Sequence, residues 1–157
     1  MSGEQSIEAH VQSALELAFR PATQRDIKEM SVLSDRARAK RDQQPHSSTT
    51  TDNLEPARIS ERIRRPGAWT YLAYDGSRLV GFDAGDPTST EERDAFVEGS
   101  EHLGMLMVDP EYWGRGIGGQ LLDWVAEHTR GKDAKHIELW TQKDNVRART
   151  LYERKGY

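Results

Sequence analysis

A glycine-dense segment is the part of this sequence that most directly indicates chemistry. Gly114, Gly116, Gly118 and Gly119 follow an apolar stretch and open a predicted helix. Glycines leave backbone N–H groups uncovered by side chains, and the first turn of a helix adds unpaired N–H donors and the positive end of the helix dipole. With Arg115 among them, these donors suit a bulky anion such as a pyrophosphate. The alternative is a tight strand-to-helix turn that binds nothing.

Two nucleotide-binding motifs are similar to this segment but fit it poorly. The spacing Gly114-x-Gly116-x-x-Gly119 satisfies the dinucleotide fingerprint, and Glu138 follows about 20 residues later. In that fingerprint, however, the first glycine follows its strand at once, whereas residues 109–113 intervene here. The sequence after Gly119 also lacks room for several further βα units. A nicotinamide-dinucleotide protein therefore stays a weaker alternative, and the absence of GxxxxGK[ST] excludes a P-loop.

A second pair of candidate residues lies near the end of the chain. Asn145 and Tyr152 are seven residues apart in a predicted helix. At about 100° per residue they lie within about 20° of each other on one helix face. An amide and a phenolic hydroxyl would then face the same side. The alternative is a tyrosine that packs between helices and has its hydroxyl satisfied elsewhere.

The two segments together resemble the motifs of the GNAT N-acetyltransferase superfamily. The signature R/Q-x-x-G-x-G/A is matched at Gly116 and Gly118, whereas Trp113 stands at its Arg/Gln position. The second segment, with Asn145, Ala148, Tyr152 and a final Gly-Tyr, is similar to the family's N-x-x-A-x-x-x-Y-x-x-x-G-F/Y motif. By motif the resemblance covers residues 102–157, and residues 17–85 agree only in the order of their elements.

The resemblance implies an α/β (α+β) fold with a mixed, splayed central sheet that is flanked by helices. It implies direct transfer of an acetyl group from acetyl-CoA to a primary amine in a ternary complex. Asn145 would hold the pantetheine arm, and Tyr152 would protonate the departing thiolate. The alternative is a non-catalytic GNAT-like module that binds an acyl-CoA. Backbone groups for pantetheine would come from Leu106, Met107 and Val108, and groups for pyrophosphate from Trp113, Gly114, Arg115, Gly116, Gly118 and Gly119.

Three residues could act as the general base that takes the proton of the amine. Glu101 and His102 lie at the start of the predicted strand 102–108, and Glu138 lies on the next strand. Because side chains alternate along a strand, Glu101 and His102 face opposite sides, so at most one of them faces the acetyl group directly. Each could also be a solvated strand-end residue.

Composition limits the remaining possibilities. The chain has 157 residues, a net charge of −4 and no cysteine. That length predicts a single domain over residues 1–157. The lack of cysteine excludes disulfides, thiolate–metal sites and an acyl-cysteine intermediate. The histidines show no metal-ligand spacing, so no metal is expected.

The same composition suggests which partners and which compartment to expect. The negative charge argues against nucleic acid and anionic membranes and mildly favours a cationic acceptor, a small-molecule or peptide amine. The first residues carry neither a basic nor an apolar segment. We therefore expect a cytoplasmic protein without a signal peptide.

Hydrophobic patterns place the elements that must position these residues. Residues 1–16 form an N-terminal extension that includes a short helix, 41–53 a mobile polar loop and 86–100 an acidic linker. An Asp75-Gly76 turn joins two of the strands. The cluster Arg58, Arg62, Arg64 and Arg65 is interpreted as a solvated helix face. Strands are predicted at 17–23, 68–74, 77–85, 102–108 and 136–142, and helices at 24–40, 54–65, 116–130 and 145–155.

Members of the GNAT superfamily usually continue past the second motif into two further strands, which the sequence ending at Tyr157 does not contain. The natural chain is longer, another subunit completes the sheet, or the edge stays open. An unpaired strand at 136–142 favours association with another strand. We therefore expect a homodimer or a longer natural chain.

Overall fold

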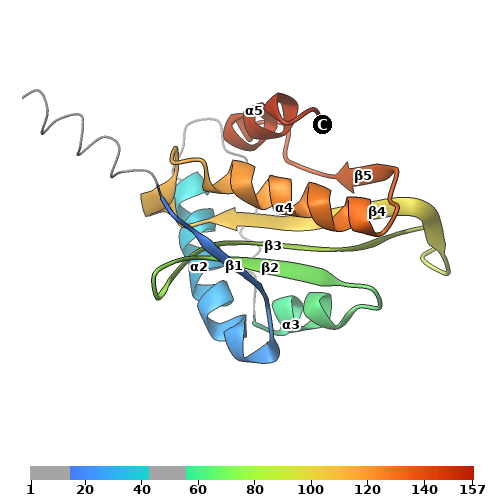
Figure 1. The fold of residues 1–157 in the computed structure, drawn as a ribbon, viewed down its shortest axis with the longest axis horizontal. Helices are drawn as coiled ribbons and strands as arrows, with labels where there is room; N and C mark the ends of the chain where they lie inside the picture. Colours follow the sequence, from blue (N-terminus) through green and yellow to red (C-terminus); the bar gives the residue numbers. More distant parts are fainter. Residues whose placement is uncertain (1–14, 43–55) are drawn as a thin grey trace, which may run out of the picture.

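A five-stranded mixed sheet forms the centre of the protein in the computed structural model, which describes residues 15–42 and 56–157. The strands lie in sequence order, β1 to β5 (Figure 1). The first four are antiparallel to one another, and β5 is parallel to β4. The predicted mixed sheet is confirmed. The strands are β1 (Ala18–Pro21), β2 (Trp69–Asp75), β3 (Arg78–Ser89), β4 (Phe96–Val108) and β5 (His136–Leu139).

Helices cover both faces of this sheet. Helix α4 (Ile117–Gly131) connects β4 to β5 across one face, and α5 (Val146–Arg154) lies beside it (Figure 1). Helices α2 (Ile27–Asp42) and α3 (Pro56–Arg64) cover the opposite face. Short 3-10 turns precede α2 and α4, at η1 (Gln24–Asp26) and η2 (Pro110–Tyr112). Among the residues that the structure describes, no helix combines the length and apolarity needed to cross a membrane.

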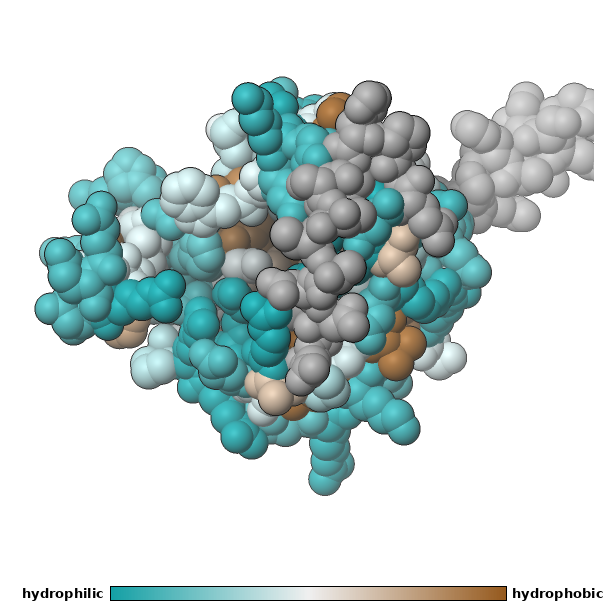
Figure 2. All heavy atoms as spheres, turned by 180° about the vertical axis from the view of Figure 1, so that it is seen from behind, coloured by the Kyte–Doolittle hydropathy of each residue, from teal (hydrophilic) through white to brown (hydrophobic). Residues whose placement is uncertain are grey.

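Alternation along β4 divides the core between the two faces. Met105 packs with α2 and α3, whereas Leu106 and Val108 pack with the residues of α4. Successive side chains of a strand point to opposite faces, so one apolar strand contributes to both layers. Where the view from behind shows described residues, the surface is mostly hydrophilic, and apolar residues appear as separate brown areas (Figure 2).

The prediction of an acidic linker at 86–100 is wrong at 86–89 and 96–100, which extend two strands, and only residues 90–95 connect them. Strand β3 continues to Ser89, β4 begins at Phe96, and the backbone of Pro87 is paired with that of Glu101. The hydroxyls of Thr88 and Ser100 are hydrogen-bonded across the hairpin at 2.8 Å. Phe96, Val97 and Glu98 are exposed, so backbone pairing rather than an apolar core holds this end of the hairpin together.

Other element boundaries differ by a few residues. The predicted loop 41–53 begins later, because Arg41 and Asp42 belong to α2. The predicted extension 1–16 and the rest of that loop lie outside the described residues, apart from Leu15 and Glu16. Strand β5 ends at Leu139 rather than at 142. The hairpin at Asp75-Gly76 is confirmed, and Gly76 adopts a φ of 60° that favours glycine.

Candidate active site

Strands β4 and β5 separate in the middle of β4. Their pairing runs from Ser100 opposite His136 to Leu103 opposite Leu139, and β4 continues for five more residues. On its other side β4 stays paired with β3 as far as Val108. In the described part of the chain, the β5-facing edge of residues 104–108 therefore lacks a strand partner. Leu106, Met107 and Val108 lie on this edge.

The glycine segment lies at the end of that edge, where α4 begins. Gly114 and Gly116 have φ values of 79° and 84°, which favour glycine. A Cβ added at either one would meet no atom within 4 Å. Gly116 is the N-cap of α4 and supplies no side-chain cap. Two open glycines and an uncapped helix N-terminus form an arrangement that suits a phosphate group.

Gly118 and Gly119 have different surroundings. A Cβ on Gly118 would lie 2.8 Å from Leu151 Cδ2, and one on Gly119 would lie 3.2 Å from Lys155 Cε. Both glycines therefore allow α5 to approach the first turns of α4 closely. The Lys155 ammonium also pairs with Asp123 of α4 at 2.9 Å.

Two aromatic residues next to the glycines are covered by arginines. The Trp113 indole N–H donates to the Val108 carbonyl at 2.9 Å, and the Arg147 guanidinium lies 4.3 Å from the centre of the Trp113 ring. Arg115 lies 4.9 Å from the centre of the Tyr112 ring. Cation–π contacts thus hold two guanidinium groups against aromatic rings at the glycine loop.

Tyr152 lies between α5 and the edge where the strands separate. It packs against the cluster of Trp69, Leu103, Leu122 and Val125, and burial raises its pKa to about 12. Its hydroxyl has no hydrogen bond to any other residue that the structure describes. The Asn145 side chain caps α5, because its Oδ1 accepts from the Ala148 N–H at 3.2 Å. That contact leaves the amide nitrogen of Asn145 available for another partner.

The candidate bases lie on opposite faces of β4, as alternation requires, and within the strand rather than at its start. Glu101 is buried on the α4 side, where it pairs with Lys132. His102 lies on the α2–α3 side, with its Nδ1 3.5 Å from Glu138 Oε1. Glu138 also accepts from the Trp140 indole N–H at 2.9 Å. Among these three candidates, only His102 and Glu138 lie on the same face of the sheet and contact each other.

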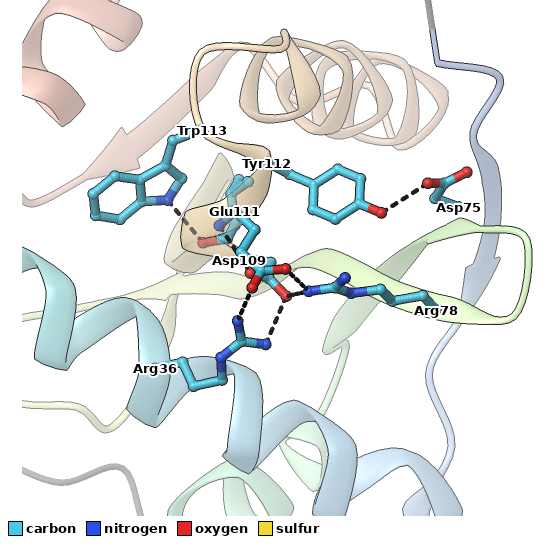
Figure 3. A network of polar contacts seen from close by, with 8 residues as sticks. Arg36, Asp75, Arg78, Asp109, Glu111, Tyr112 and Trp113 are labelled. Carbon is cyan, nitrogen blue, oxygen red and sulfur yellow. Dashed lines mark hydrogen bonds and ion pairs between the residues drawn. The ribbon is translucent and has the colours of Figure 1, made fainter. Parts of the chain in front are cut away.

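A polar network in front of the glycine loop was not predicted from the sequence. Asp109 is 2% exposed, and Arg36 and Arg78 reach its carboxylate from two sides at 2.9 and 3.0 Å (Figure 3). Arg78 also bonds to Glu111 at 2.5 Å. The Tyr112 hydroxyl donates to Asp75 at 2.8 Å, which raises the pKa of Tyr112. The network joins α2 and the β2–β3 hairpin to the segment that leads into the glycines.

The described residues contain no group of three or more His, Cys, Asp or Glu side chains that could hold a metal ion. The site therefore consists of a strand edge, a glycine loop at a helix N-terminus, a partly buried phenol and a histidine.

The chain belongs to the acetyltransferase (GNAT) family, whose family model matches residues 29–157. Among curated proteins it is 31% identical over 137 residues to a mycothiol acetyltransferase of Geodermatophilus obscurus, over 82% of this chain and 41% of that protein. The chain thus spans less than half the length of that relative. It is 28% identical to YhfO, an uncharacterized N-acetyltransferase of Bacillus subtilis, over 63% of this chain and 64% of that protein.

Solved structures show the same fold. The structure of a PaiA N-acetyltransferase from Thermoplasma acidophilum in complex with coenzyme A matches with a TM-score of 0.75 at 15% identity. The match covers 90% of this chain and 89% of that one. At this identity the likeness concerns the fold. The family match and the fold agree with the resemblance of the two sequence motifs.

Proposed function

We propose that the protein transfers an acetyl group from acetyl-CoA to a primary amine by direct attack within a ternary complex. The observation that carries the proposal is the separation of β4 from β5 next to the open glycine loop. The pantetheine amides would bond to the backbone of Leu106–Val108 on this edge, apart from the Val108 carbonyl, which already accepts from the Trp113 indole. The pyrophosphate would lie against residues 113–119, where backbone N–H groups and Arg115 offer positive charge.

The reaction requires two proton transfers. The neutral amine attacks the thioester carbonyl, the C–S bond breaks, and a base takes a proton from the nitrogen. His102 is the preferred base because it lies on the face opposite α4 beside Glu138, whereas Glu101 is buried against Lys132. The departing sulfur receives a proton, and backbone N–H groups near Met107 stabilise the oxyanion.

Tyr152 is proposed to donate a hydrogen bond to the departing sulfur. A phenol with a pKa of about 12 is a weaker acid than a typical thiol, whose pKa is about 8.5. Complete proton transfer is therefore unfavourable by about 5 kcal/mol until the cofactor changes the surroundings. A hydrogen bond that strengthens as the C–S bond breaks fits these values better than an early proton transfer. The high pKa also keeps the phenol protonated up to strongly alkaline pH.

Kinetics of Tyr152→Phe test the proposal. The variant should bind acetyl-CoA as the parent does in titration calorimetry, but its kcat should fall about 100-fold. The rate is measured as thiol release over a panel of amines, with product mass spectrometry. Thiol release at an unchanged rate would remove Tyr152 from the mechanism. If the parent protein binds coenzyme A but no amine of the panel causes thiol release, the protein is an acyl-CoA-binding module instead.

The same assay tests the base. His102→Gln should lower kcat by at least tenfold while leaving acetyl-CoA binding intact. Glu101→Gln should act mainly on stability, because it breaks the pair with Lys132. A larger fall in kcat for Glu101→Gln than for His102→Gln would assign the role of base to Glu101.

A further inference from the structure

Arg62 of α3 extends toward the sheet instead of into solvent. Its Nη1 atom is buried and has no hydrogen-bond partner among the described residues. The predicted solvated arginine cluster is therefore wrong at this position. Burial, followed by the charge of Arg65, lowers the pKa of Arg62. A partly desolvated guanidinium without an ion pair is costly, and a bound anion would offset that cost.

Gly104 makes room for this guanidinium. A Cβ on Gly104 would overlap Arg62 Nη1, so the arginine lies against the bare backbone of β4. Gly104 is also the first residue of β4 beyond its pairing with β5. The arginine therefore lies where the two strands separate, on the face opposite α4.

The polar groups around Arg62 on this face are also incompletely paired. Asp86 and His102 are direct cross-strand neighbours, and Asp86 Oδ1 and His102 Nδ1 are buried without hydrogen-bond partners among the described residues. Arg65 approaches the other oxygen of Asp86 at 3.8 Å. Glu138 lies beside His102. One face thus presents a free guanidinium nitrogen near carboxylates and the preferred base.

This distribution of charge suits a zwitterion. Asp86 and Glu138 would attract an ammonium group and repel a phosphate dianion, whereas Arg62 would bind the two oxygens of a carboxylate. The phosphates of coenzyme A are unlike the expected ligand of Arg62, because they are expected at the glycine loop. Arg62 lies against Gly104, which precedes Val108 by about 13 Å of strand, and the glycine loop follows Val108. His102 and Gly104 are two residues apart, about 7 Å along the strand, within the span of one small molecule.

We propose that Arg62 binds a carboxylate of the acceptor, so that the substrates are amines that also carry a carboxylate, such as amino acids. The inference rests on the proposed function and makes it specific. Simple polyamines would lack the group that Arg62 binds. Arg62 is then a specificity-determining residue, and Gly104 is the residue that positions it.

Matched pairs of amines test this inference. Lysine is compared with 1,5-diaminopentane, and β-alanine with ethylamine, as kcat/KM for thiol release. The parent should prefer the carboxylate-bearing member of each pair by at least about tenfold. Arg62→Gln should abolish that preference by lowering kcat/KM only for the carboxylate-bearing member. Arg64→Gln, an exposed arginine on the same helix, is the matched control and should keep the preference.

Two further variants separate recognition from folding. Arg62→Lys keeps the charge without the planar fork and should retain part of the preference. Gly104→Ala displaces the guanidinium and should reproduce the loss seen in Arg62→Gln. Circular dichroism identifies any variant that has unfolded. A parent without the preference, or an Arg62→Gln variant that is folded and keeps it, overturns the inference.

Calorimetry can measure the binding of the same amines without turnover. The protein is first saturated with coenzyme A. Arg62-dependent binding of the carboxylate-bearing members without thiol release would support the carboxylate site and refute the transferase proposal. Equal binding of both members of each pair would overturn the carboxylate site, even if acetyl transfer occurs.

Discussion

At the scale of single residues, Asp83 is the most unusual group in the sheet. Its side chain is fully buried in β3, where Oδ1 accepts a hydrogen bond from the Tyr71 N–H at 3.0 Å. Oδ2 has no partner among the described residues. Burial raises the pKa of this carboxyl to about 8. Asp83 is therefore mostly protonated at neutral pH and behaves as a neutral core residue.

Replacing Asp83 by Asn should stabilise the protein at alkaline pH. In the unfolded chain the carboxyl ionises near its ordinary pKa of 3.8, whereas in the folded chain it ionises only near 8. Because the folded state keeps the proton that the unfolded state loses, stability falls as pH rises from about 4 to about 8. Asp83→Asn removes that loss, so its Tm at pH 8 should exceed the parent's by about 5–10 °C.

The check is calorimetric melting at several pH values between 4 and 8. The Tm difference between Asp83→Asn and the parent should be small near pH 4 and grow with pH. Asp35→Asn, an exposed carboxyl on α2, controls for the removal of a negative charge. A Tm difference that is the same at every pH would contradict the prediction that Asp83 keeps its proton in the folded state.

Single residues also show which parts of the structure could not be predicted from the sequence. Glycine spacing and a seven-residue interval were enough to propose the glycine loop and Tyr152 as site residues, because both patterns depend on local geometry, and their roles stay predictions. Arg62 was grouped with its exposed neighbours, although its spacing of three residues from the buried Ile59 already placed it toward the sheet. The burial of Asp83 depends on the packing of the folded sheet, which the residues next to it in sequence do not reveal.

At the scale of elements, Asp109 connects α2, the β2–β3 hairpin and the glycine loop. The carboxylate also accepts from the Glu111 N–H at 3.0 Å and so caps the η2 turn. A buried carboxylate with two guanidinium partners and a backbone donor fixes the direction in which the chain leaves β4. The position of the glycine loop therefore depends on Arg36 and Arg78, which lie on other elements.

Asp109→Ala should weaken acetyl-CoA binding as well as stability. The loss of these contacts should cost about 1–3 kcal/mol of folding free energy, because both arginines are partly exposed and can regain water. A misplaced loop should also raise the KM for acetyl-CoA several-fold while changing kcat less. Urea unfolding and steady-state kinetics measure the two effects.

Glu111→Ala is the matched control for this network. Glu111 shares Arg78 with Asp109 but is 62% exposed, so its removal should cost under about 1 kcal/mol. Equal losses of folding free energy in the two variants would show that the burial of Asp109 does not add to stability. An unchanged KM in Asp109→Ala would mean that the network stabilises the fold without positioning the loop.

Element prediction succeeded where apolar periodicity was strong and failed where backbone pairing alone defines a strand. The strands and helices of the core were located within a few residues. The extension of β3 and β4 over 86–100 was missed because Glu98 and the exposed Phe96 gave no alternation with a buried face. Pairing across a long hairpin depends on the partner strand, which a single segment does not reveal.

At the scale of the whole molecule, the sheet is asymmetric. Strand β1 pairs with β2 at one edge, and the short β5 forms the other edge beside the free part of β4. The outer side of β5 has no strand partner in the described part of the chain. Trp140, which directly follows β5, is 80% exposed. An open strand edge beside a large exposed aromatic side chain favours contact with another protein surface.

We propose that this edge is covered either by a second copy of the chain, which forms a homodimer, or by further residues of a longer natural chain. Sedimentation velocity over a range of concentrations should show a dimer for the parent. Trp140→Lys should raise the dissociation constant about 30-fold, because a central aromatic contact contributes about 2 kcal/mol. Val32→Lys, at an exposed apolar residue of α2 on the other side of the molecule, should leave the association unchanged. A parent that sediments as a monomer at every concentration would refute the dimer, and equal weakening by both variants would place the interface elsewhere.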